Sequence, residues 1–174
     1  MSNDREIFAE AAAVGSRRAA EALAALVGKT VTSSSAVEAA PAGVPEKATM
    51  LHTRFDVQGF PEGHFVAAFG KESVNAMRAF LAPGMEDSKE AREMVAIEVS
   101  NICVSQFLSA LGDMLDTPLV PTAPLLEEPP VDRSDHDYLI HTAFKSEDGG
   151  EVHGTLRFTP PPGLMDALRA HAKK

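Results

Sequence analysis

Two stretches of the chain, Met50–Phe69 (MLHTRFDVQGFPEGHFVAAF) and Leu139–Phe158 (LIHTAFKSEDGGEVHGTLRF), are similar to each other and determine how the fold is organised. A shift of 89 residues superimposes them, and 6 of their 20 positions are then identical. The identical pairs are His52 and His141, Thr53 and Thr142, Phe55 and Phe144, Glu62 and Glu151, His64 and His153, and Phe69 and Phe158. Self-similarity at a fixed spacing indicates a tandem duplication.

A second block of similarity precedes each of these stretches. A shift of 88 residues superimposes Phe8–Val31 on Ala96–Leu119 and places Glu10 on Glu98. Apolar residues recur at helical spacing in both blocks, which are rich in the strong helix formers Ala, Leu and Glu. We therefore expect two equivalent long helices, one at the start of each half.

Each half is expected to contain five elements in the order α-β-β-β-α. In the first half they are helix Ile7–Val27, strands Thr30–Val37, Thr49–Val57 and His64–Gly70, and helix Glu72–Leu81. In the second half they are helix Ser88–Leu115 with Ser88 as its N-cap, strands near Leu119–Leu126, His136–Lys145 and Glu151–Thr159, and helix Gly163–Ala172. Turns at residues 59–63 and at 148–150 join the hairpins, and the acidic segment Leu126–Ser134 is expected to be a loop.

The predicted fold class is α+β. The chain is expected to form a single domain over residues 1–174, made of two pseudo-symmetric halves at about 5–84 and 88–174. Both halves would contribute to one shared sheet, with the long helices packed on it.

Composition narrows the classes of function. The chain has 174 residues, with 16 Lys and Arg against 25 Asp and Glu, and this net charge of −9 argues against nucleic acid as the main ligand. Neither an apolar run of about 18 residues nor an export signal is present, so we expect a cytoplasmic protein without a membrane span. The single cysteine, Cys103, is expected to be a small buried apolar residue.

Glu98 and Asn101 are the first candidates for a functional site. They are three residues apart on the second long helix and therefore lie on one face, about one turn apart. An Asn in the middle of a helix is mildly unfavourable, so its presence needs a reason. The spacing alone favours an ordinary solvated face.

The surroundings of this pair resemble the CheC/CheX/FliY family of chemotaxis phosphatases, and CheC most closely. The family signature is an Asp or Ser, three residues, a Glu, two residues, an Asn, and a Pro after 22 more. Glu98, Asn101 and Pro124 match this signature at the required spacing, whereas Met94 stands at the Asp/Ser position.

The first half carries a second copy of the same motif. Glu10 matches the Glu of the signature, but Ala13 replaces the Asn and Ala36 stands where the Pro would be. Ala13 has no group with which to hold a water molecule, so we expect Glu10 and Ala13 to form a degenerate site. A docking surface of lower affinity is the alternative.

The resemblance implies hydrolysis of the aspartyl phosphate of a CheY-type response regulator. In that family the Glu, here Glu98, engages an active-site lysine of the regulator, and the Asn, here Asn101, orients the attacking water. The regulator holds the Mg²⁺, so the resemblance implies no metal or cofactor on this chain. The alternative is a non-catalytic adaptor that binds a receiver domain or the deamidase CheD.

The remaining candidate residues favour structural roles. The acidic and histidine residues of 135–137 point alternately across a strand, which suits a single metal ion poorly. Arg17 and Arg18 are expected on a solvent-exposed helix face. The motifs of phosphate-binding loops and of nucleophile elbows are absent from the sequence. Four histidines recur in equivalent strands and favour sheet structure over a metal site: His52, His141, His64 and His153.

Overall fold

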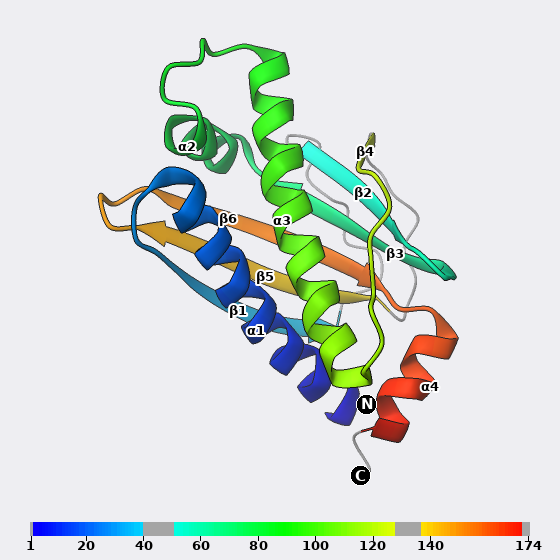
Figure 1. The fold of residues 1–174 in the computed structure, drawn as a ribbon. Coiled ribbons are helices and arrows are strands. Elements are labelled where there is room, and N and C mark those ends of the chain that lie inside the picture. The colour runs from blue at the N-terminus through cyan, green and yellow to red at the C-terminus, as the bar shows by residue number, and fades with distance from the viewer. Residues whose placement is uncertain (1, 40–50, 128–136, 172–174) are drawn as a thin grey trace.

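The computed structural model describes residues 2–39, 51–127 and 137–171 of the chain (Figure 1). Within these ranges the elements follow the predicted order, which confirms the α+β class. They are α1 (Ser2–Val27), β1 (Val31–Ala39), β2 (Leu51–Val57), β3 (Phe60–Phe69), α2 (Lys71–Leu81), α3 (Lys89–Leu115), β4 (Leu125–Glu127), β5 (Tyr138–Ser146), β6 (Glu151–Thr159) and α4 (Pro162–His171).

The described strands form one antiparallel sheet in the order β1-β5-β6-β3-β2-β4. Exchanging β1, β2 and β3 with β4, β5 and β6 returns the same order, counted from the opposite edge. The two halves therefore share one sheet, as predicted. This symmetry of topology agrees with a duplication, which itself remains a prediction.

The two long helices lie side by side and antiparallel on one face of the sheet, with α2 and α4 beside them (Figure 1). Between helices and sheet lies a core of phenylalanine rings. Phe65 of β3 and Phe158 of β6 are cross-strand partners and stack with 4.3 Å between ring centroids. Phe107 of α3 meets Phe65 edge-on at 5.3 Å, and Phe8 of α1 meets Phe158 edge-on at 5.4 Å. These contacts fix both long helices against the centre of the sheet.

α3 begins and ends with recognisable caps. The Ala91 N–H donates a hydrogen bond of 3.1 Å to Ser88 Oγ, which confirms the predicted N-cap. Asp116 adopts a left-handed conformation (φ 51°) and ends the helix. Among the described residues, α3 is the one helix long and apolar enough to cross a membrane. However, 56% of its most apolar window is buried inside the fold, as in the core helix of a soluble protein.

The expected strand Leu119–Leu126 is largely wrong. Only Leu125–Glu127 forms a strand, and upstream of it Pro121 makes an isolated bridge with Val57. The physical reason is the prolines at positions 118, 121 and 124, which have no N–H to donate to a ladder. The segment still follows the β2 edge, because the N–H of Gln58 donates to Val120 and that of Thr122 donates to Asp56.

The expected turn over residues 59–63 is only partly right, because the turn is confined to residues 58 and 59. β3 already begins at Phe60, after a tight turn in which Gly59 has a φ of 81°. The pairing of β2 and β3 then shifts register between Asp56 and Val57, so residues 61–63 form an irregularity within the hairpin. The turn at 148–150 is confirmed, with Gly149 at a φ of 91°.

Several predicted bounds differ or lie outside the described residues. α1 begins at Ser2, five residues before the predicted start. Parts of four predicted elements lie outside the described residues. These are the first residues of the expected strands Thr49–Val57 and His136–Lys145, most of the loop Leu126–Ser134, and the last residue of the helix Gly163–Ala172.

Candidate functional site

The exposed face of α3 carries the predicted site. One side of the helix is buried against α1 and the sheet, through Val95, Val99 and Cys103 among others. The opposite side presents Met94 and Glu98, which are exposed, and Asn101, which is half-buried. Because residues three and four apart neighbour each other on a helix, these three side chains form one continuous strip, which we call the α3 strip.

The two polar side chains of the α3 strip are available for a partner. Within the part of the chain that the structure describes, the side chains of Glu98 and Asn101 form no hydrogen bond or ion pair. The buried residues on either side of them, Val95, Val99 and Ser100, hold the helix backbone in place. A carboxylate and a carboxamide are thus presented about one turn apart on a rigid element, which can bind a cation and position a water molecule.

The first half presents the equivalent face of α1. Glu10 and Ala13 are both exposed, as are Glu6 and Arg17 at the positions equivalent to Met94 and Ser105. The structure therefore places the two motif copies on the exposed faces of two antiparallel helices. In α1 that face has no carboxamide at the position equivalent to Asn101.

The segment after α3 lies at the edge of the sheet, beside β2. Pro124 is half-buried and directly precedes β4, which pairs with β2, and α3 contacts β2. In the register of β2 and β4, Leu126 lies opposite Thr53, and Leu125 lies opposite Arg54. Thr53 shares its sheet face with the core residue Phe55, so Leu126 lies on the helix-covered face and Leu125 on the other.

The four repeated histidines differ in burial and in the residues that they contact. His52 is buried, whereas His141 is exposed and lies 2.8 Å from Glu38, and His153 lies 3.1 Å from Glu151. His64 hydrogen bonds Thr159 at 3.3 Å, and burial, followed by the charge of Arg54, lowers its pKa.

A metal site is not formed in the described ranges. Within residues 2–39, 51–127 and 137–171, no three His, Cys, Asp or Glu side chains lie together so that they could hold a metal ion. Asp137 belongs to no such group in these ranges, and its carboxylate accepts a hydrogen bond of 2.7 Å from the Thr159 hydroxyl. Residues 135 and 136 lie outside the described ranges. That this chain binds no metal stays a prediction.

Arg17 and Arg18 differ in their surroundings. Arg17 is exposed as expected, but Arg18 joins the two long helices, because its guanidinium lies 2.7 Å from Asp113 and 3.3 Å from Ser109. Cys103 is buried in the core, and burial raises its pKa to about 12. It therefore stays a thiol and is unsuited to act as a nucleophile.

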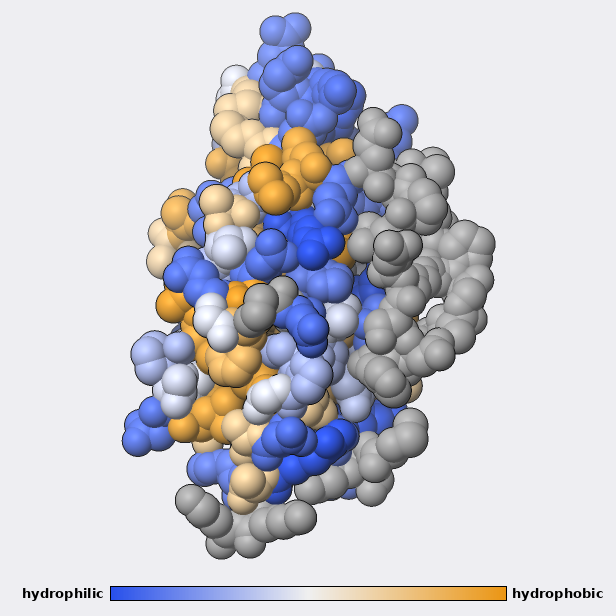
Figure 2. Space-filling model, turned by 90° about the vertical axis from the view of Figure 1, so that its right-hand side faces the viewer, coloured by the Kyte–Doolittle hydropathy of each residue, from blue (hydrophilic) through white to orange (hydrophobic). Residues whose placement is uncertain are grey.

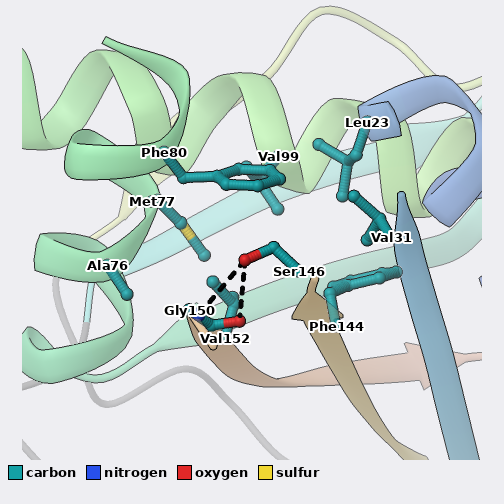
Figure 3. A pocket seen from close by; sticks show the side chains of 10 residues that line it. All are labelled: Leu23, Val31, Ala76, Met77, Phe80, Val99, Phe144, Ser146, Gly150 and Val152. Atoms are coloured by element: carbon teal, nitrogen blue, oxygen red, sulfur yellow. Dashed lines mark hydrogen bonds between the residues drawn. The ribbon is translucent and has the colours of Figure 1, made fainter. Parts of the chain in front are cut away.

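An apolar pocket lies at the end of the molecule where α1 finishes (Figure 3). It holds about 350 Å³ of space, part of it open to solvent. Its lining consists of Leu23, Val31, Ala76, Met77, Phe80, Val99, Phe144, Ser146, Gly150 and Val152. The one hydroxyl in this lining, that of Ser146, already hydrogen bonds Asp148 and the Gly150 carbonyl. The pocket therefore offers no free polar group for orienting a ligand.

Two residues near the site were not recognised from the sequence. Met94 was considered only as a departure from the family signature, yet 48% of it is exposed beside Glu98. Leu126 was expected within a longer strand, and 44% of it is exposed on the helix side of the sheet edge. Its direction depends on the register between β2 and β4, for which the sequence holds no local signal.

Comparisons with known proteins find similarity in structure alone. No protein-family model matches the sequence, and no curated protein matches it. Among solved structures, FliY from Thermotoga maritima is similar with a TM-score of 0.75 and 13% identity, over 99% of this chain and 97% of that one.

Two further structures show the same arrangement. CheX from Desulfovibrio desulfuricans has a TM-score of 0.59 and 17% identity over 86% of this chain and 98% of its own. The middle domain of FliM from Vibrio alginolyticus has a TM-score of 0.66 and 11% identity over 95% of this chain and 99% of its own. The chain therefore has the fold shared by FliY, CheX and the FliM middle domain, which is the fold that the resemblance to the CheC/CheX/FliY family implies.

Proposed function

We propose that this protein is a phosphatase that hydrolyses the aspartyl phosphate of a CheY-type receiver domain in chemotaxis signalling. The observation that carries the proposal is the α3 strip, on which Glu98 and Asn101 are both accessible and free of partners among the described residues. Had either side chain been buried in the core, it could not reach an active site in another protein. The fold shared with FliY and CheX supports the same proposal.

The chemistry asked of Asn101 is the positioning of water. Hydrolysis of an acyl phosphate needs a water molecule held in line with the bond that breaks, and holding it there can supply most of the acceleration. A carboxamide offers a donor and an acceptor on one group, so it can fix both the position and the orientation of a water molecule. Asn101 sits on a helix anchored by buried neighbours, which limits its freedom to move away.

The role proposed for Glu98 is docking. An exposed carboxylate one turn from Asn101 can pair with a lysine at the rim of the receiver active site and so set the depth at which the carboxamide enters. Mg²⁺ would be held by the receiver, next to its phosphoryl group. This chain would contribute no metal or cofactor of its own, and the encounter would take place in the cytoplasm.

The test is the decay of a ³²P-labelled CheY-type receiver domain in the presence of Mg²⁺. We expect the wild-type protein to accelerate the decay and Asn101→Ala to lose about 100-fold of that acceleration, because water is no longer held in line. Glu98→Ala is expected to raise the concentration of protein needed for half-maximal acceleration. Wild-type protein that accelerates no receiver of the same organism would refute the proposal.

The second candidate is a non-catalytic adaptor that binds a receiver domain or CheD. The observations that favour it are Met94 at the Asp/Ser position of the signature and the loss of the carboxamide at Ala13. The shared fold also includes the FliM middle domain, and a FliG–FliM complex is among the similar structures. Binding of a phosphorylated receiver without faster decay would select the adaptor over the phosphatase.

A further inference from the structure

The starting observation is an exposed methionine at the N-terminal end of the α3 strip. Met94 is 48% exposed and lies one turn before Glu98 on the same strip. The Cβ atoms of residues four apart on a helix are about 6 Å from each other. A specific interface covers about 800 Å² of each partner, which corresponds to a disc of about 16 Å radius. A partner seated on Glu98 and Asn101 therefore has to cover Met94 as well.

A second exposed apolar residue lies on the same side of the sheet. Leu126 is 44% exposed and belongs to the edge strand β4, beside β2 and on the face that α3 covers. Figure 2 views the right-hand side of Figure 1, toward which the β4 edge lies, and shows apolar atoms gathered in its upper half among hydrophilic ones. Met94 therefore adds apolar surface directly beside the polar pair of the α3 strip, and Leu126 adds apolar surface at the β4 edge on the same side of the sheet.

We propose that Met94 and Leu126 are specificity-determining contacts of the receiver complex, an inference that rests on the proposed function. They would take up an apolar side chain at the rim of the receiver active site, while Glu98 takes up a cation from the same rim. The surface of the receiver that binds here would therefore carry a cationic side chain and an apolar side chain next to the phosphorylated aspartate. The equivalent face of α1 carries Glu6 where Met94 stands, so it would not accept the same partner.

The experiment separates binding from catalysis. Binding is measured by titration with CheY-type receiver domains carrying beryllofluoride, a stable mimic of the aspartyl phosphate, and catalysis by the decay of the ³²P-labelled receivers at saturating protein. We expect Met94→Ser and Leu126→Ser each to weaken binding about five- to tenfold, since the lost contact is roughly half a buried side chain. The decay rate at saturation is expected to remain that of wild type, and Met94→Leu to restore binding.

The chain offers a matched control for each variant. Met85 is 37% exposed but lies in the loop before α3, and Leu125 is 59% exposed but faces the opposite side of the sheet from Leu126. Met85→Ser and Leu125→Ser are therefore expected to bind as wild type does. Equal binding by wild type, Met94→Ser and Leu126→Ser would overturn the inference, even if decay is accelerated. A different result would separate the two proposals. If the wild type binds the receiver without accelerating its decay, and both variants bind more weakly, the phosphatase proposal is refuted and the proposed interface is supported.

Discussion

Asn101 and Ala13 occupy equivalent positions on two antiparallel helices, and only one of them can hold a water molecule. Both lie on the accessible side of their helix, and each has a glutamate one turn before it, Glu98 and Glu10. The difference between the two faces is therefore confined to the side chains that they present. This makes the pair of glutamates an internal control for the proposed chemistry.

Glu10→Ala is expected to leave the acceleration of receiver decay within about twofold of wild type. The α1 face lacks the carboxamide, so its carboxylate has no water-positioning partner to serve. Glu98→Ala in the same assay is expected to lower the acceleration by about tenfold at subsaturating protein. Equal losses for Glu10→Ala and Glu98→Ala would mean that both faces engage the receiver.

At the residue scale the sequence predicts the polar pair better than its surroundings. Helical spacing is enough to place Glu98 and Asn101 on one face, and the apolar residues between them indicate which side is buried. Spacing cannot tell whether Met94 is covered by another element, because Met is common in cores. Its exposure follows from the positions of α1, α2 and the sheet, which are properties of the tertiary structure.

Among the elements, α1 and α3 approach each other closely at Gly15, where a glycine is required. A Cβ atom at Gly15 would lie 2.8 Å from the Cα of Phe107, closer than real Cβ contacts come. Glycine in a helix interior costs about 1 kcal/mol relative to alanine, and the close approach of the two helices explains why it is present. Because α3 carries the candidate site, this crossing also fixes where the site stands relative to the sheet.

Gly15→Ala is expected to destabilise the protein by about 1–3 kcal/mol despite the better helix propensity of alanine, because the backbone of α3 must move away. The free energy of unfolding from urea titrations measures this. Gly163→Ala is the control, since a Cβ there meets nothing within 4 Å in the helix α4. It is expected to be neutral or slightly stabilising. A Gly15→Ala variant as stable as wild type would contradict the tight crossing.

The order and type of the elements could be predicted, and the errors have identifiable causes. The helices were recognised because their apolar period is long and regular, as in α3 with its cap at Ser88. The strand expected at Leu119–Leu126 is mostly absent because the prolines at 118, 121 and 124 have no N–H to donate to a ladder. The early start of β3 at Phe60 was missed because Gly-Phe-Pro-Glu-Gly has the composition of a turn while the structure accommodates it as an irregularity.

Across the whole molecule, an ion pair joins the first helix to the last. Arg169 of α4 donates two hydrogen bonds, of 3.1 and 2.9 Å, to the two carboxylate oxygens of Asp4 in α1. Asp4 is only 5% exposed. The hydrogen bonds from Arg169 lower the pKa of Asp4 below its ordinary value of 3.8. Because the pKa is lower in the folded protein, this contact stabilises the fold above about pH 4 and loses its effect as the pH falls further.

Asp4→Asn is expected to lower the Tm by about 3 °C at pH 7, because the charge-assisted pair is lost while the shape is kept. At pH 2.5 the difference from wild type is expected to shrink, because below the ordinary pKa of 3.8 the unfolded chain takes up a proton that the folded carboxylate, with its lowered pKa, resists. Thermal unfolding of both proteins followed by circular dichroism at the two pH values measures this. A Tm difference that is the same at pH 7 and pH 2.5 would contradict the role of the ionised pair.

The symmetry of the whole sheet is the feature that the repeat predicts most directly. Two copies of α-β-β-β-α lead to a shared sheet, and the observed order β1-β5-β6-β3-β2-β4 has the expected symmetry. The sequence does not contain the order itself, because which strands become neighbours depends on pairings between residues far apart in the chain, such as Phe65 with Phe158. The positions of Glu98 and Asn101 could be predicted because one helix carries both. The exposed position of Leu126 could not, because it depends on the pairing of β4 with β2.

The proposed role of Asn101 is tested by the single-turnover decay of a phosphorylated CheY-type receiver. The decay is measured with wild-type protein and with Asn101→Ala, at concentrations where both proteins bind the receiver fully. We expect fast decay with the wild type and decay close to the spontaneous rate of the receiver with Asn101→Ala, although both proteins bind the receiver equally. Equal decay rates for the two fully bound proteins would contradict the role of Asn101 and the phosphatase mechanism with it.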